Sequence, residues 1–126
     1  GPSGHGQLTK MVNQLCIAGL IQGLSEGVAL GKLSNLNMTK VLEALSGGAA
    51  QSWQMDNRFK SMVDGKFDFG FAVDLMIKDL KIALNESSSN DLDLSISKNV
   101  LKRYEKLSEK KMGNLDTSSL IKLFNV

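Results

Sequence analysis

The hydrophobic residues of this chain repeat at helical spacing along most of its length. In residues 7–33 they recur at steps of three and four, and this pattern predicts one long helix. Such a helix would extend about 40 Å, because each residue adds 1.5 Å. It is apolar around much of its circumference, so we expect it to lie at the centre of the fold. Glycines inside it, such as Gly23 and Gly27, predict close packing against another helix.

Five further helices follow from the same pattern and from their end signals. Asn37 and Asp116 are suitable N-caps for the second and the last of them, and Gly47-Gly48 would end the second. The expected ranges are 38–45, 52–63, 71–85, 95 or 97 to about 112, and 117–124. Alternation typical of strands is not sustained anywhere, and the single proline is at position 2. The sequence therefore predicts an all-α domain of six helices around the long first one.

Composition narrows the class of protein. With 126 residues, 42% hydrophobic and 22% charged, the chain corresponds to one globular domain. Its net charge of +2 argues against a dedicated nucleic-acid binder. Cys16 has no partner for an internal disulfide, and its apolar neighbours predict a buried thiol. With one histidine and one cysteine, no transition-metal cluster is expected.

The same sequence features favour a cytoplasmic protein without a membrane partner. There is no layout of a secretory signal, and the longest nearly uncharged run, residues 11–25, is shorter than a membrane span. A basic run with interspersed glutamates follows residue 97; its cations are Lys98, Lys102, Arg103, Lys106, Lys110 and Lys111. This pattern is typical of a solvated helix face and favours that interpretation over a nucleic-acid groove.

Candidate chemistry begins in the first turns of the long helix. Lys10 and Asn13 are three residues apart, so they lie on one helical face and can address the same small volume. A lysine there could be a general acid or base, or simply a solvated lysine. Gly4 and Gly6 precede it, but they are not followed by the Gly-Lys-Ser/Thr of a phosphate loop. His5 between them is expected to be an exposed loop residue.

A second candidate lies in residues 71–80. Phe71 and Lys78 are seven residues apart, close to two helical turns, so both are expected to face one way. Asp79 lies about 100° further round the helix from Lys78. Asp74 is one turn before Lys78, and a surface ion pair between them is an equally good interpretation of that lysine.

Four segments in order give the chain a resemblance to a known family. They are Gly-x-Gly-x-x-x-Lys-x-x-Asn at 4–13, Leu-Ser-Gly-Gly-Ala-Ala at 45–50 with Ser52-Trp53, Phe71 with Lys78-Asp79-Leu80, and Gly-Asn-Leu-Asp-Thr-Ser-Ser-Leu at 113–120. Over essentially its whole length the chain resembles the C-terminal helical domain of the β-hydroxyacid dehydrogenases, which is similar to that of 6-phosphogluconate dehydrogenase. The family includes 3-hydroxyisobutyrate dehydrogenase.

The resemblance implies a role for each candidate residue. Lys10 would be the catalytic general acid/base, and Asn13 would hold the substrate and position the lysine. Phe71 would line the substrate pocket near the nicotinamide, with Asp79 supporting the site. Lys78 would contact the NAD or NADP cofactor. The substrate would be a small 3-hydroxy acid or semialdehyde such as 3-hydroxyisobutyrate.

The resemblance also implies what lies outside residues 1–126. The family has an N-terminal Rossmann domain with Gly-x-Gly-x-x-Gly, and this motif does not occur here. The chain is thus expected to be the C-terminal catalytic and dimerisation domain, inactive alone, with its own Rossmann domain as partner. The long helix would form much of a homodimer or homotetramer interface. The alternative is a non-catalytic helical dimerisation module that has kept the fold; NAD and NADP stay equally open.

Overall fold

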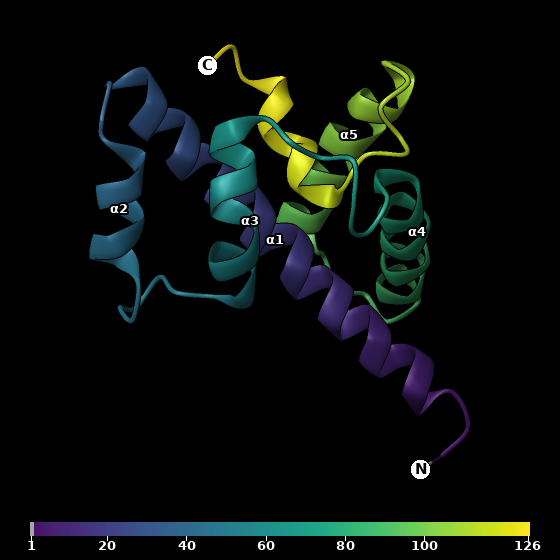
Figure 1. Ribbon diagram of the computed structural model, residues 1–126. Coiled ribbons are helices and arrows are strands. Elements are labelled where there is room, and N and C mark those ends of the chain that lie inside the picture. The colour runs from purple at the N-terminus through teal and green to yellow at the C-terminus, as the bar shows by residue number, and fades with distance from the viewer. Residues whose placement is uncertain (1) are drawn as a thin grey trace.

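The computed structural model describes residues 2–126, and these form the six helices drawn in Figure 1. Their bounds are α1 His5–Leu33, α2 Met38–Leu45, α3 Trp53–Asp64, α4 Val73–Ser89, α5 Ser95–Glu109 and the short 3₁₀ helix η1 Thr117–Leu123. The described residues contain no strand, only one isolated bridge between Ala72 and Asp116. The predicted all-α class and the count of six helices are confirmed for this part of the chain.

Helix α1 is the central element of the domain. It contacts each of the other five helices, and Figure 1 shows it crossing the whole molecule, with α2 beside its C-terminal end and α4 on the opposite side. Its buried positions follow steps of three and four residues, from Met11 through Ala18, Ile21 and Ser25 to Val28. The predicted central helix is therefore confirmed, and the periodic pattern identifies its buried face.

The core consists of two clusters on either side of that helix. The first joins α1 to α4, α5 and η1 through Ala18, Ile21, Val73, Met76, Leu80, Val100, Tyr104, Leu107 and Leu120. The second joins α1 to α3 and η1 through Val28, Met55, Phe59, Met62, Phe67 and Ile121. Helix α2 has no buried residue and packs with a half-buried apolar face. The domain is thus firmly packed around α4 and α5 and more open around α2.

Side-chain caps fix three helix starts. Asn37 accepts a hydrogen bond from the Lys40 amide at 3.1 Å, and Asp116 accepts one from the Ser118 amide at 3.1 Å, as predicted. Ser52, expected as the first helical residue, is instead the cap of α3 and accepts from the Met55 amide at 3.0 Å. Each cap satisfies an amide that the helix itself cannot pair.

The fourth helix differs from its predicted range of 71–85. It begins at Val73, because the Phe71 amide donates to Asp116 and the Val73 amide donates to the Leu115 carbonyl at 2.8 Å. At its other end the serine-rich segment stays helical to Ser89, and its serine hydroxyls hydrogen-bond carbonyls of the preceding turn. Phe71 is therefore a loop residue.

Three smaller boundaries also differ. Helix α1 starts at His5, so this exposed histidine is helical and does not lie in a loop. Helix α5 ends at Glu109, before Lys111 takes a positive φ of 63°. The last helix is a 3₁₀ helix that ends at Leu123.

The predicted burial of Cys16 is wrong. The thiol is exposed, because residue 16 lies on the face of α1 opposite Gln14 and Ala18, which point into the core. Its apolar neighbours in sequence gave no information about that direction, since adjacent residues on a helix point about 100° apart.

Only one described helix, α1, is long and apolar enough to cross a membrane, with a mean hydropathy of 1.2 over its most apolar window. That window is 44% buried inside the domain, and α1 contacts every other helix. The central position of α1 explains its apolar composition without a membrane.

Substitution at the core of α4 provides a test of this architecture. Leu80→Ala removes a fully buried side chain, and we expect it to lower the free energy of unfolding by about 2–5 kcal/mol. Ile82→Ala, on the same helix but 38% exposed, is the matched control and should cost well under half as much. Chemical denaturation of both variants measures the difference, and equal losses would contradict the assigned core.

Candidate functional site

A cleft of about 320 Å³ lies where the N-terminal half of α1 meets α3, the α3–α4 loop and the start of η1. It is lined by Lys10, Asn13, Gln14, Ile17, Gln54, Arg58, Phe71, Met76, Asp116 and Thr117. Three of the five residues singled out from the sequence, namely Lys10, Asn13 and Phe71, are in this lining. A fourth, Asp79, is outside the lining but forms an ion pair with Lys10.

Lys10 occupies the second turn of α1 and is anchored by a buried carboxylate on α4. Its Nζ lies 3.5 Å from Oδ1 of Asp79, whose side chain is only 6% exposed, whereas the Lys10 side chain is 54% exposed. The ammonium thus has one partner on the protein side and remains accessible from the cleft. A charged group held at the wall of a small cleft can exchange a proton with a bound ligand.

Gln14 connects the other candidates and was missed by the sequence analysis. Its Nε2 donates to Oδ2 of Asp79 at 2.9 Å, and its Oε1 accepts from Nδ2 of Asn13 at 3.0 Å. Lys10, Asp79, Gln14 and Asn13 therefore form one connected polar network, with Gln14 itself buried. Gln14 lies four residues after Lys10, so the same helical-face argument that selected Asn13 could have found it.

Phe71 closes the cleft on the side of the α3–α4 loop. Its ring is 36% exposed, and its backbone is bound on both sides by the start of η1. With Ile17 and Met76 it makes part of the cleft wall apolar, opposite the polar network on α1. The cleft therefore offers both a charged group and an apolar surface to a small ligand.

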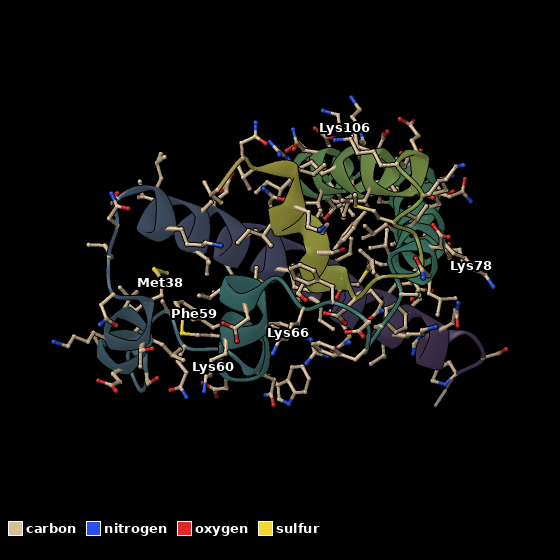
Figure 2. All side chains as sticks on the ribbon, turned by 45° about the horizontal axis from the view of Figure 1, so that its top comes forward. Met38, Phe59, Lys60, Lys66, Lys78 and Lys106 are labelled. Atoms are coloured by element: carbon tan, nitrogen blue, oxygen red, sulfur yellow. The ribbon has the colours of Figure 1, made fainter. Side chains whose placement is uncertain are left out.

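Lys78 does not share the cleft. The expectation that it faces the same way as Phe71 is wrong, because Phe71 precedes α4 and does not follow its helical periodicity. Lys78 is exposed and projects outward from α4 (Figure 2). The alternative ion pair with Asp74 is also not observed, since Asp74 accepts from the Ser108 hydroxyl at 2.7 Å.

A second buried carboxylate, Asp116, lies on the far wall of the cleft. Nε of Arg58 is 2.9 Å from its Oδ2, and the Asp116 side chain is 1% exposed. From the sequence, Asp116 was expected as a helix cap and as part of the segment at 113–120, and Arg58 was not singled out. No local pattern marks this pair, because its members are 58 residues apart.

The buried phenol of Tyr104 contacts Thr117, another residue of the same wall. Burial, and next the nearby carboxylate of Asp116, raise the pKa of Tyr104 well above its ordinary value. The phenol is therefore a neutral donor, and its hydroxyl donates to the Thr117 carbonyl at 3.2 Å. This bond fixes the start of η1 against α5.

The basic run on α5 and just after it is a solvated face, as expected. Its five lysines are all exposed, and Figure 2 shows Lys106 pointing away from the molecule. Lys98 pairs with Asp93 at 2.8 Å, and neither side chain is buried.

Comparison with known proteins gives this geometry its context. Residues 4–124 match the family model described as "NAD-binding of NADP-dependent 3-hydroxyisobutyrate dehydrogenase". The chain belongs to the β-hydroxyacid dehydrogenase family.

Individual relatives agree with this assignment. An uncharacterized oxidoreductase of Shewanella frigidimarina is 53% identical over 96% of this chain and 42% of its own length. A probable mitochondrial 3-hydroxyisobutyrate dehydrogenase-like protein of Arabidopsis thaliana is 37% identical over 96% of this chain and 36% of its own length. The chain thus spans less than half the length of these curated relatives.

A solved structure supports the fold as well. The crystal structure of 3-hydroxyisobutyrate dehydrogenase from Salmonella typhimurium superimposes with a TM-score of 0.83 and 27% identity, over 93% of this chain and 41% of the other. The resemblance found in the four sequence segments is therefore confirmed.

NAD(P) is the cofactor of this family domain, and the described residues can supply only part of its site. They contain no strand followed by a glycine-rich turn, which is how dinucleotide phosphates are usually held. Lys78, to which the resemblance gives the cofactor contact, is exposed on α4 and makes no ion pair within residues 2–126.

The polar network of this family domain can be tested through Gln14. Gln14→Leu keeps a similar volume but leaves a buried oxygen of Asp79 without its donor, so we expect a loss of about 1–3 kcal/mol in the free energy of unfolding. Gln51→Leu is the matched control, because the Gln51 amide donates to Asp56 at 3.1 Å on the surface. Thermal unfolding should separate the two; an equally small effect of both would contradict the role of Gln14.

Proposed function

We propose that the full-length protein is a cytoplasmic NAD(P)-dependent oxidoreductase that acts on a small 3-hydroxy acid or the matching semialdehyde, such as 3-hydroxyisobutyrate. This chain would be its C-terminal catalytic domain. The observation that carries the proposal is the position of Lys10, which lines a small cleft while its Nζ is held 3.5 Å from the buried Asp79. Family membership supports the reaction class, and the substrate is our proposal.

The bound NAD(P) would accept or donate the hydride at the substrate carbon. Lys10 moves the proton at the substrate oxygen: as the neutral amine it takes the hydroxyl proton during oxidation, and as the ammonium it returns that proton during reduction. Asp79 keeps the Lys10 side chain at the cleft wall, because the ion pair favours one side-chain position of a flexible lysine. The Asn13 amide, itself held by Gln14, would hydrogen-bond the substrate.

The shape of the cleft fits this substrate class. A volume of about 320 Å³ is at the small end for ligand sites and suits a compact hydroxy acid. The apolar wall formed by Ile17, Phe71 and Met76 would contact the carbon skeleton, while Lys10 and Asn13 address the oxygen atoms.

The remaining machinery would come from a Rossmann domain outside this chain. The chain spans 42% of the Shewanella relative, which leaves room for such a domain. That domain would hold most of the NAD(P), with Lys78 of this chain as an additional contact.

Lys10→Ala in the full-length enzyme tests the central assignment. General acid/base groups contribute about 10²–10⁴-fold to rate, so we expect kcat to fall by at least a hundredfold, with the folded state preserved. Lys102→Ala, at an exposed position of α5, is the control and should retain full activity. Retention of more than a tenth of the wild-type rate by Lys10→Ala would reject the role.

Activity assays of the wild-type protein distinguish the proposed enzyme from the main alternative, a non-catalytic dimerisation module. Hydride transfer to NAD or NADP with small 3-hydroxy acids is expected of the full-length protein. No turnover with any of them, in a protein that still self-associates, would favour the non-catalytic dimerisation module.

We also propose that the protein is a homodimer or homotetramer whose subunits meet along the outward face of α1. That face carries exposed apolar side chains, including Val12 at 61%, Leu20 at 47% and Leu30 at 66% exposure. A Cβ at Gly23 or Gly27 would meet nothing within 4 Å, so the packing predicted for these glycines is not supplied within residues 2–126. A second copy could approach the helix backbone there.

An apolar groove of about 400 Å³ beside these glycines supports the same proposal. It runs between α1, α2 and α3 and includes Val41, Leu45, Met55 and Phe59. A helix of a partner subunit packed in this groove would bury its apolar lining.

Leu20→Glu tests the interface. The new charge would be buried without a partner, so we expect the oligomer to dissociate to a smaller species at micromolar concentration. Ile96→Glu, at a side chain that is 72% exposed on α5, is the matched control and should leave the assembly unchanged. Sedimentation velocity measures both, and a monomeric wild type would contradict the proposed assembly.

A further inference from the structure

Asp116 receives more hydrogen bonds than a helix cap needs. Its Oδ1 accepts from the Phe71 amide at 2.9 Å. Its Oδ2 accepts from Nε of Arg58 at 2.9 Å, from the Ser118 amide at 3.1 Å and from the Ser118 hydroxyl. The residue is fully buried, and a buried carboxylate is tolerated only when it is paired and hydrogen-bonded in this way. All of its partners are donors.

The backbone around Asp116 binds the α3–α4 loop as well. The Asp116 amide donates to the Phe67 carbonyl at 2.8 Å, and the Thr117 amide donates to the Phe71 carbonyl at 2.8 Å. The antiparallel bridge between Ala72 and Asp116 joins the same two segments. The amide and the carbonyl of Phe71 are therefore both bound to the start of η1.

The loop also passes directly against the ion pair. Gly70 has a φ of +77°, and a Cβ there would collide with Oδ1 of Asp116 and lie 2.9 Å from Nη2 of Arg58. The Arg58 guanidinium is itself held between two rings, 5.2 Å from the centre of Trp53 and 5.0 Å from that of Phe69. The Arg58 guanidinium and the Asp116 carboxylate therefore hold each other, and both contact the α3–α4 loop.

We propose that the Arg58–Asp116 pair positions the Phe71 ring at the wall of the cleft, and that Arg58 and Asp116 thereby act as positioning residues for substrate binding. The inference rests on the proposed function, since it assigns the Phe71 side of the cleft to the substrate. The Phe71 backbone has no helix to hold it, because α4 begins at Val73. Its orientation therefore depends on Asp116 and Thr117, which lie 45 and 46 residues further along the chain.

The variant Asp116→Asn isolates this role because it is nearly isosteric. Asparagine has one acceptor oxygen, and the Oδ2 position faces three donors, from Arg58 and Ser118, while Oδ1 faces one, from Phe71. The oxygen will stay with the larger group, which directs the new NH₂ at the Phe71 amide. The substitution thus releases the Phe71 amide, and it also removes the negative charge that pairs Arg58.

The full-length enzyme carrying Asp116→Asn is expected to show a hydroxy-acid KM raised about tenfold, with the KM for NAD(P) within about twofold of wild type. Amide hydrogen exchange at Phe71 should become faster in the same variant. Asp93→Asn is the matched control, because Asp93 pairs with Lys98 at 2.8 Å on the surface, far from the cleft lining. It should change neither quantity.

A double-mutant cycle with Phe71→Ala decides whether Asp116 acts through Phe71. If it does, the double variant has the KM of the worse single variant within about twofold, whereas independent effects would multiply. If Asp116→Asn does not fold, Arg58→Gln takes its place in the cycle and should raise the same KM at least threefold.

The possible results distinguish a failure of the positioning role from a failure of the proposed function. An active wild type in which these variants leave the hydroxy-acid KM unchanged, or raise both KM values equally, overturns the positioning role alone. A wild type without turnover on any small hydroxy acid overturns the proposed function, and the substrate role of Phe71 with it. Multiplying effects in the cycle would show that Asp116 acts by a route other than Phe71.

Discussion

The domain depends on a single unbroken helix that serves both the core and the cleft. The buried face of α1 supplies Ala18, Ile21 and Val28 to the two hydrophobic clusters, and its first turns carry Lys10, Asn13 and Gln14. A side chain on a packed helix is held more precisely than one on a loop. The packing that stabilises the fold therefore also fixes the position of the polar network.

Two buried carboxylates face this helix from opposite sides of the cleft. Asp79 is paired with Lys10 and Gln14, and Asp116 is paired with Arg58 and the backbone of the α3–α4 loop. The two pairs differ in exposure: the Lys10 side chain is 54% exposed, but that of Arg58 is only 15% exposed. The first pair leaves its cation available to a ligand, whereas the second uses its cation within the protein. The two proposals therefore assign proton transfer to the exposed pair and the positioning of Phe71 to the buried pair.

The sequence predicted the helices because their signals are local. Periodicity located α1, and the caps at Asn37 and Asp116 located two helix starts, since each depends on residues only a few positions apart. Lys10, Asn13 and Phe71 line one cleft, and their roles there stay predictions. The start of α4 was not predictable in this way, because the bonds that keep Phe71 out of the helix come from Leu115 and Asp116. Arg58 was missed for the same reason, and the burial of Cys16 was misjudged from its neighbours in sequence.

The outward face of α1 links the proposed assembly to the cleft. The exposed stripe formed by Val12 and Leu20 lies on the same helix as Lys10 and Gln14, but on its other side. Packing of a second subunit against that stripe would bury apolar area at a favourable free energy of about 25 cal/mol per Å². It would also restrain the N-terminal turns of α1, which carry Lys10 at the end of the helix, where helices fray most easily. Self-association would therefore hold Lys10, the proposed general acid/base, in place without adding any residue to the cleft.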